Sequence, residues 1–226
     1  MASSRHRKTL LLGAAVFAFA AAGVASAADL DKGQELFHQC AQCHGARGEG
    51  NQANLAPSIA GMDAWYVKSQ LENFQAGTRG KHPDDMGGLR MYPISLSLKS
   101  DYGGTDAEKI EAVSAYVESL PEVVPIQRVE GGDAEKGAVF YATCKQCHGA
   151  EGQGNQQMNS PPLAGTSDWY LVTELEQYKQ GIRGGNPANT NAVLMRGMSN
   201  MLPDDQAIRD VVAYIVTLQP SKQEGN

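Results

Sequence analysis

The sequence predicts an all-α fold built from two tandem copies of one small helical domain. Residues 33–80 align with residues 137–184 at a constant offset of 104 positions, and 21 of the 48 pairs are identical without a gap. A repeat of this length indicates two copies of one folded unit. Apolar residues in each copy recur at helical spacing, and no segment shows a clear strand pattern. We expect domains at 28–120 and 133–226, joined by a linker rich in proline and glycine at 121–132.

Each copy is predicted to contain three helices joined by long loops. The first runs from about Asp31 to Cys43 and recurs from Asp133 to Cys147, where it ends in a cysteine motif. The second follows Asp63 in one copy and Ser167 in the other. Its apolar positions line one helical face. They are Val67, Leu71 and Phe74 in the first copy, matched by Leu171, Leu175 and Tyr178 in the second.

The third helix of each copy is marked at both ends. Thr105-Asp106 and Asp204-Asp205 occupy the expected N-cap positions, and Pro121 and Pro220 follow the expected ends. These helices match at an offset of 98, so the first copy carries six extra residues in segment 97–105, which we expect to form a surface loop. The apolar positions are Ile110, Val113, Val117 and Leu120, and in the second copy Ile208, Val211, Val212, Ile215 and Leu218.

The pentapeptide Cys40-Ala41-Gln42-Cys43-His44 recurs as Cys144-Lys145-Gln146-Cys147-His148. Each reads C-x-x-C-H, the attachment signature of a c-type haem. Two thiols one helical turn apart can each add to a vinyl group on one porphyrin edge, and the adjacent histidine can then coordinate the iron. A thioredoxin-like redox pair and half of a zinc site are the alternatives, but neither needs the intact pentapeptide in each copy. The motifs therefore predict two covalently bound haem c groups, held by Cys40, Cys43, His44, Cys144, Cys147 and His148.

The residue on the other face of each haem decides between electron transfer and catalysis. At the offset of 104, Met91 is the one methionine that faces another methionine, Met195. We therefore predict Met91 and Met195 as the sixth iron ligands, opposite His44 and His148. Two closed, six-coordinate haems leave no open iron position for a substrate. His82 is expected in a solvated loop, and its use as the ligand in the first domain is the alternative.

Residues 1–27 are predicted to be a cleavable signal peptide that directs export to the periplasm. Three basic residues precede the apolar run Leu10–Val24, and Ala25-Ser26-Ala27 forms a small-residue cleavage site. The apolar run has 15 residues, fewer than the ~20 that a spanning helix needs. We therefore expect no stable membrane insertion after cleavage, with an uncleaved anchor as the alternative.

Removal of that segment makes the chain more acidic. Three of the 19 Lys+Arg residues lie in it, which leaves 16 against 25 Asp+Glu, a net charge of −9. Such acidity argues against binding to nucleic acid or to anionic membranes, and favours partners with a basic docking patch. All four cysteines lie in the two haem motifs, so we expect no disulfide.

With these motifs, the chain resembles the dihaem class I cytochromes c of the cytochrome c4 type over nearly all of residues 29–220. The resemblance implies two tandem class I cytochrome c domains, related by a pseudo-twofold axis with their haem edges facing each other. It implies that Gly33 and Gly137 allow the first and last helices to cross closely, and that Pro57 and Pro161 offer carbonyl groups to the ligand imidazoles. It rests on the duplicated C-x-x-C-H-G, the P-x-[IL]-x-G segments 57–61 and 161–165, the Met91 and Met195 segments, and the Ala-Tyr pairs at 115–116 and 213–214.

The resemblance also implies an electron carrier without catalytic residues. Its redox partners would be a quinol-oxidising complex or dehydrogenase as donor and a terminal oxidase as acceptor, contacted transiently by a monomer. A dihaem enzyme, such as a thiosulfate dehydrogenase or a peroxidase, is the alternative, as is a haem subunit of a larger complex. Met91-Tyr92-Pro93 departs from the family pattern and leaves the packing of that loop open. Trp65, Trp169, Arg79 and Arg183 either contact haem propionates or pack as core and surface residues.

Overall fold

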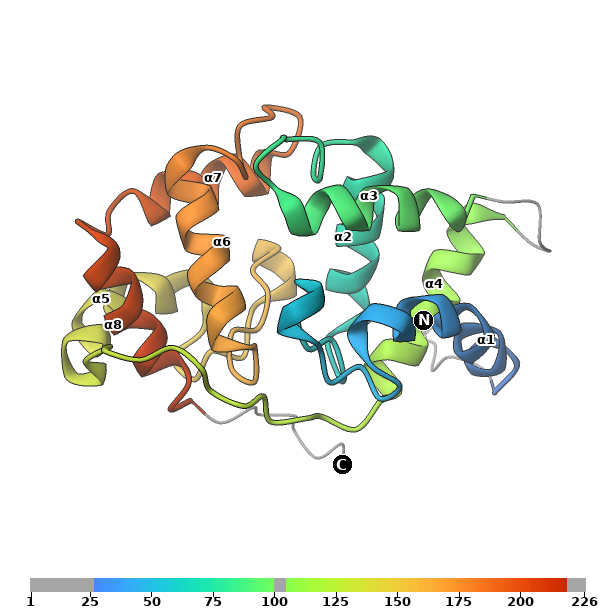
Figure 1. Cartoon of the computed structure of the whole chain (residues 1–226), viewed down its shortest axis with the longest axis horizontal. Coiled ribbons are helices and arrows are strands. Elements are labelled where there is room, and N and C mark those ends of the chain that lie inside the picture. The colour runs from blue at the N-terminus through green and yellow to red at the C-terminus, as the bar shows by residue number, and fades with distance from the viewer. Residues whose placement is uncertain (1–26, 100–104, 219–226) are drawn as a thin grey trace, which may run out of the picture.

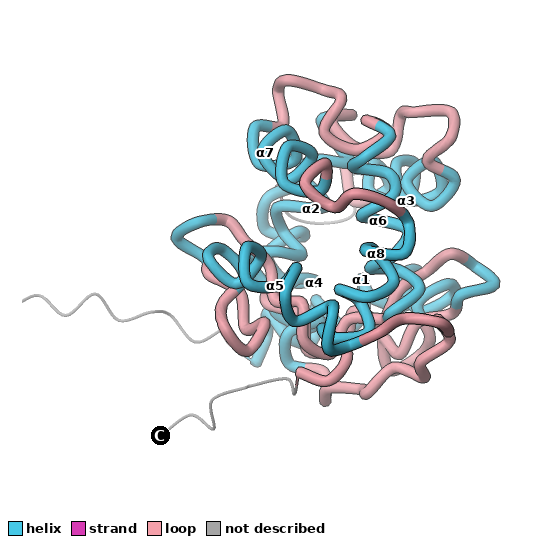
Figure 2. Tube along the Cα trace, turned by 90° about the vertical axis from the view of Figure 1, so that its left-hand side faces the viewer, coloured by secondary structure: helices cyan, strands magenta, loops and turns pink. Residues whose placement is uncertain are grey.

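The structure, a computed structural model, describes residues 27–99 and 105–218, and this part of the chain consists of helices joined by loops (Figure 2). The predicted all-α fold of two tandem domains is confirmed. The predicted signal peptide, apart from Ala27, and residues 100–104 of the predicted insertion lie outside the described residues. The first copy holds α1 (Ala27–His44), α2 (Ala64–Ala76), α3 (Met86–Ser97) and α4 (Asp106–Ser119). The second holds α5 (Ala134–His148), α6 (Asp168–Gln180), α7 (Thr190–Ser199) and α8 (Asp205–Ile215).

The prediction of three helices per copy was wrong, because each copy has a fourth, α3 or α7. The sequence of α3 contains Gly87, Gly88 and Pro93, all of which disfavour a helix. Local capping and packing override that tendency. The Asp85 carboxylate accepts a hydrogen bond from the backbone N–H of Gly88 at 2.7 Å, and the Gln75 side chain of α2 donates to the carbonyl of Ser95 at 2.8 Å.

The first and last helices of each copy cross where the sequence analysis placed a glycine. A Cβ atom at Gly33 of α1 would overlap the carbonyl oxygen of Ala112 in α4. One at Gly137 of α5 would overlap the carbonyl oxygen of Asp210 in α8. The glycines therefore permit backbone contact between the helices, and a hydrophobic core forms around each crossing. The core around the second crossing contains Tyr141, Leu171, Leu202, Ala207, Ile208, Val211, Val212 and Ile215.

The predicted helix boundaries are largely confirmed by capping interactions. Thr105 and Glu108 form a reciprocal capping box at the start of α4, and Asp204 accepts a hydrogen bond from the N–H of Ala207 at the start of α8. Asp133 caps α5 in the same way. Helix α4 ends at Ser119, two residues before Pro121. Pro220, the other predicted stop, lies outside the described residues. Among those residues, no helix is both long and apolar enough to cross a bilayer.

The two copies lie side by side, and the segment between α4 and α5 runs along one edge of both (Figure 1). Asp168, the first residue of α6, holds this segment in place. Its Oδ2 atom accepts hydrogen bonds from the backbone N–H groups of Arg128 at 2.5 Å and Val129 at 2.7 Å. The Asp168 side chain is buried, and its charge lies at a helix N-terminus, where an anion is stabilised.

Replacing Asp168 with alanine is expected to detach the linker from the second domain. The change removes two hydrogen bonds to a charged acceptor, each worth about 1.5–3 kcal/mol when intact, and lets water reach the freed N–H groups. Trypsin should then cleave after Arg128 faster than in the parent protein, as measured by limited proteolysis and mass spectrometry. Glu130→Gln, a change at an exposed linker residue, is the control and should leave the cleavage rate unchanged. Equal rates in Asp168→Ala and the parent would show that other contacts hold the linker.

Candidate functional site

Each C-x-x-C-H motif lies at the C-terminal end of a helix, α1 or α5, and its histidine is buried. The Nδ1 atom of His44 is 2.9 Å from the carbonyl oxygen of Pro57, and Nδ1 of His148 is 2.8 Å from that of Pro161. A carbonyl oxygen only accepts, so Nδ1 carries the proton and Nε2 keeps a free lone pair. Burial lowers the pKa of both imidazoles, which favours the neutral form that a metal ligand needs. The predicted roles of the two prolines thus agree with the observed contacts.

In the second copy, the predicted haem-binding residues share one cavity. Cys144, Cys147, His148 and Met195 all line it. Met198 lies one helical turn from Met195 on α7 and lines the same cavity. The remaining wall is largely apolar and includes Leu171, Leu175, Leu202, Val211 and Ile215. The cavity therefore combines two thiols, an imidazole and five methionine thioethers, those of Met62, Met158, Met195, Met198 and Met201, in a largely apolar surrounding. This set includes the donors of a c-type haem with a methionine ligand.

The alternative interpretations of the cysteine motifs fit this structure poorly. Burial raises the pKa of Cys40 to about 11 and also raises the pKa of Cys144. A thioredoxin-type nucleophile needs a lowered thiol pKa. Within the described ranges, no three His, Cys, Asp or Glu side chains are close enough together to hold a metal ion, as a zinc site requires.

In the first copy, Met91 lies on α3, at the position that Met195 occupies on α7, and its side chain is partly buried. The doubtful Met91-Tyr92-Pro93 segment is thus helical rather than a loop. His82 lies in the turn before α3 with 42% of its side chain exposed, as expected for a solvated loop. Its Nδ1 atom accepts a hydrogen bond from the backbone N–H of Asp84 at 3.3 Å.

The cavity of the second copy extends to the domain interface. Trp65, Tyr66 and Gln70, from α2 of the first copy, line it together with Glu174 and Arg183 of the second. Trp65 therefore reaches the haem cavity of the other domain. Both tryptophan rings pack edge-on against the tyrosine that follows them, Trp65 against Tyr66 and Trp169 against Tyr170.

Arg79 and Arg183, whose roles the sequence left open, are both buried and meet at this interface. Both form ion pairs with Glu174, and Arg79 also donates a hydrogen bond to the Tyr170 hydroxyl at 2.8 Å. Burial and the neighbouring charge of Arg79 lower the pKa of Arg183 to about 10, which leaves it protonated at neutral pH. Neither arginine is a surface residue. Gln70 and Glu174 were missed in the sequence, although the offset of 104 aligns them.

The residues of this region fit a haem with its propionates. The two guanidinium groups share the carboxylate of Glu174, and the buried carboxylate of Asp85 also acts on Arg183. Among the described atoms, Nε of Arg79 is buried and has no acceptor. A porphyrin offers an apolar ring for the cavity and two carboxylates for such donors. His148 and Met195 would hold the iron, and Cys144 and Cys147 the ring.

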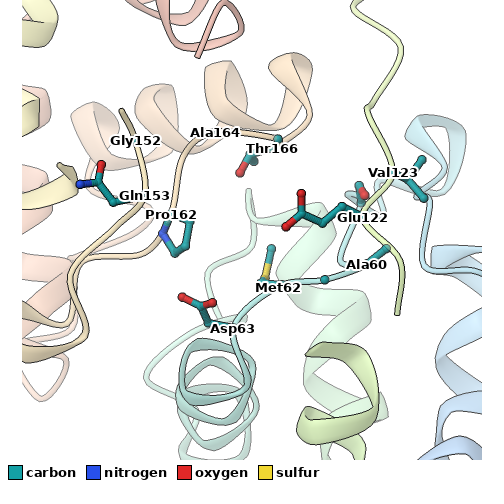
Figure 3. Close-up of a pocket in the computed structure, with 13 residues that line it drawn as sticks. Ala60, Met62, Asp63, Glu122, Val123, Gly152, Gln153, Pro162, Ala164 and Thr166 are labelled. Atoms are coloured by element: carbon teal, nitrogen blue, oxygen red, sulfur yellow. The ribbon is translucent and has the colours of Figure 1, made fainter. Parts of the chain in front are cut away.

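A second, smaller pocket lies elsewhere on the same interface (Figure 3). It is lined by Met62 and Asp63 of the first copy, Pro162 and Thr166 of the second, and Glu122 of the linker. Met62, Pro162 and Thr166 also line the haem cavity, so the two spaces adjoin. The lining of this pocket includes no residue of the cysteine motifs.

Known proteins agree with this geometry. The family model for cytochrome c matches residues 30–121 and again 134–219. The thiosulfate dehydrogenase electron acceptor of Stutzerimonas stutzeri is 32% identical over 213 residues, covering 86% of this chain and 88% of that protein. The cbb3-type cytochrome c oxidase subunit FixP of Bradyrhizobium diazoefficiens is 31% identical over 186 residues, covering 72% of this chain and 60% of that subunit.

A solved structure extends the agreement to the arrangement of both domains. Reduced recombinant cytochrome c4 from Pseudomonas stutzeri superimposes with a TM-score of 0.63 at 26% identity, covering 84% of this chain and 98% of the other. Two haem c groups are therefore bound covalently, through Cys40 and Cys43 in one domain and Cys144 and Cys147 in the other. The chain belongs to the cytochrome c family, as a dihaem electron-transfer protein of the cytochrome c4 type.

Proposed function

We propose that this chain is a periplasmic electron carrier that shuttles single electrons from a dehydrogenase or a quinol-oxidising complex to a terminal oxidase. The observation that carries the proposal is the ligand set: an imidazole with a free Nε2 and a methionine thioether line one cavity in the second copy. The first copy repeats the imidazole geometry, with Met91 at the matching place on α3. Both iron positions are then closed to substrate.

The residues of the chain supply what a carrier needs. Haem c contributes an iron that cycles between ferrous and ferric states. Pro57 and Pro161 fix the orientation of the ligand histidines, and a histidine held in this way loses little freedom when it binds the iron. The apolar wall of the cavity excludes water, and thioether ligation raises the reduction potential.

The comparisons support these classes of partner. One relative is named as the electron acceptor of a thiosulfate dehydrogenase, which favours a dehydrogenase of that kind as the donor and a carrier rather than an enzyme. Another is a subunit of a cbb3-type oxidase, which favours such an oxidase as the acceptor. The acidity of the chain, with 25 Asp+Glu against 19 Lys+Arg over its whole length, favours basic docking patches on the partners.

Lower ionic strength is expected to speed electron transfer from the reduced protein to its oxidase. Surface charges act over about 10 Å at 0.1 M salt and over longer distances in dilute salt, so steering should raise the rate by roughly tenfold between ~0.2 M and ~0.02 M. Stopped-flow oxidation by detergent-solubilised cbb3-type oxidase would measure this. A neutral small-molecule oxidant serves as the control, because its rate should not depend on salt. A rate with the oxidase that does not change with salt concentration would contradict electrostatic steering between the two proteins.

The same preparation separates the carrier from an enzyme. Thiosulfate added alone to the oxidised protein should leave both haems ferric. Addition of a catalytic amount of a thiosulfate dehydrogenase should then reduce both haems, as seen in the visible absorption spectrum. Rapid reduction by thiosulfate alone would identify the chain as an enzyme and overturn the proposal.

A further inference from the structure

Four exposed apolar side chains stand where the haem cavity of the second copy reaches the surface, and we call them the apolar mouth. They are Val139 on α5, Met158 after the cysteine motif, Leu194 on α7 and Met201 just after α7, exposed by 73%, 47%, 62% and 63% respectively. Among the described residues that line this cavity, Glu174 and Arg183 carry a charge, and both are buried. The cavity lining therefore presents no exposed charge at its mouth.

The matched positions of the first copy hold polar or charged residues. At the offset of 104, the counterparts of the apolar mouth are Glu35, Asn54, Arg90 and Ser97. Nη1 of Arg90 donates a hydrogen bond to the backbone carbonyl of Asn54 at 2.8 Å. The Ser97 hydroxyl donates to Oε1 of Gln39 on α1, also at 2.8 Å. These bonds join α3 to the loop after the cysteine motif and to the helix that carries it, so the matched positions surround one opening in the first copy as well.

Binding of the haem does not explain the apolar mouth. Both copies bind haem c, and the first does so with polar or charged side chains at all four positions. Two other matched pairs in this region do not follow the same trend, since Leu55 matches Asn159 and Ile94 matches Met198. The difference is therefore confined to the four positions of the apolar mouth. A group of exposed apolar side chains on a soluble domain marks a contact site for another molecule.

We propose that the apolar mouth is the docking site for a redox protein with an uncharged, apolar contact face, which exchanges electrons with the C-terminal haem. The lack of exposed charge in the cavity lining decides the chemistry of this partner. A charged group pressed against an apolar surface loses its hydration without gaining a counter-ion, and this is costly. The first copy, with Glu35 and Arg90 at the matched positions, does not suit such a face.

The inference rests on the proposed carrier function, because it names the surface through which a carrier would meet a partner. It is compatible with steering by the acidic surface of the chain. Long-range charge sets the rate of encounter, whereas contacts at the interface mainly set the lifetime of the complex. Four side chains give a small contact, as is usual for transient electron-transfer complexes. The effect of the apolar mouth should persist at ~0.2 M salt, where charges further apart than about 8 Å are largely screened.

A polar-mouth variant of the haem-loaded protein tests the docking site. It carries Met158→Asn, Leu194→Gln and Met201→Ser, of which the first and third install the residues of the first copy. None of the three alters the net charge, so steering is unchanged. Two probe proteins are used at ~0.2 M salt, a detergent-solubilised cbb3-type oxidase as acceptor and a thiosulfate dehydrogenase as donor. The KM for this chain should rise about tenfold with at least one of them, as expected when central apolar contacts of an interface are lost.

A matched control makes the same kind of change elsewhere. Val124→Gln with Ile126→Gln replaces two exposed apolar residues of the linker, which runs along the edge of the molecule opposite α7 (Figure 1). This variant should keep the KM of the parent with both probe proteins. All three proteins should react equally fast with a neutral small-molecule oxidant, and redox titration should give the same potentials, which shows that both haem sites are intact.

The inference is overturned if the polar-mouth variant keeps the parent KM with both probe proteins. A shift in the potential of the C-terminal haem without a change in KM would also overturn it, since the four side chains would then serve the haem alone. Self-association of the parent that the variant loses, measured by analytical ultracentrifugation, would make a second copy the occupant and contradict the proposal. Loss of co-sedimentation with phosphatidylcholine vesicles would do the same in favour of a lipid surface.

These results also separate the docking site from the proposed function. A parent protein that reacts with neither probe protein counts against the carrier function. A parent that reacts, together with a polar-mouth variant that reacts equally well, counts against the docking site alone.

Discussion

Replacing Met195 with histidine is expected to lower the reduction potential of the C-terminal haem by roughly 0.2 V, part of the ~0.8 V range that axial ligands span. The reason is that thioether ligation raises the potential of a haem iron and a second imidazole does not. The ferric spectrum should lose the thioether-to-iron charge-transfer band of that haem, about half of the total. Met91→His should do the same at the N-terminal haem. Redox titration followed by absorbance measures both effects.

Four other methionines line the same cavity as Met195, namely Met62, Met158, Met198 and Met201, and one of them supplies a control. Met198 lies one turn from Met195 on α7 and lines the same cavity. Met198→Leu should leave the potential and the charge-transfer band unchanged, because Met195 is the methionine with a counterpart in the first copy. A loss of the band in Met198→Leu, together with its survival in Met195→His, would show that the ligand had been misassigned.

The first domain has its own control. His82 is exposed on a loop, so His82→Ala should leave the spectrum of the N-terminal haem unaltered. In the parent protein, a high-spin ferric haem, or ready binding of carbon monoxide to the ferrous form, would indicate an open iron position. That result would favour an enzyme over a carrier.

Much of the fold could be predicted because the two halves of the chain are copies that can be aligned with each other. The repeat at an offset of 104 aligned the haem motifs, the crossing glycines and the helix that follows Asp63 or Ser167. Helix α3 escaped prediction because its glycines and its proline disfavour a helix in isolation. Its stability comes from the Asp85 cap and from contacts with α2, which are tertiary and leave no periodic signal.

The interface escaped prediction for a related reason. Buried charges are rare, so Glu174 was not singled out, and Arg183 was left open between a contact with a haem propionate and a packing role. Their burial depends on the docking of the two domains, which no local pattern encodes. Asp168 is similar, since its acceptor role depends on where the linker passes. Met91 and Met195 could be proposed as ligands because one aligned position holds methionine in both copies.

The close crossing of α5 and α8 should make Gly137 one of the least replaceable residues of the second domain. Gly137→Ala is expected to lower the free energy of unfolding of that domain by about 3 kcal/mol, the upper end of the usual cost of overpacking. The added Cβ would overlap the carbonyl oxygen of Asp210 and press against the Cβ of Tyr214, at 2.9 Å. The first of these is a backbone atom that cannot rotate away, so the helices must separate. The alanine gains only about 1 kcal/mol of helix propensity in return.

Gly197→Ala provides the matched control, because Gly197 also lies in a helix, α7, and no atom lies within 4 Å of its added Cβ. This change should raise stability by about 0.5–1 kcal/mol through the unfolded chain alone. Guanidinium unfolding of the haem-loaded protein, followed by the recovery of tryptophan fluorescence as the haems move away, measures both variants. If both variants raised the free energy of unfolding, the α5–α8 crossing would have to tolerate a wider separation of the helices. Backbone contact at Gly137 would then not be what holds the domain together. A loss of stability in Gly137→Ala together with a gain in Gly197→Ala would show that Gly137 provides close helix contact rather than backbone flexibility.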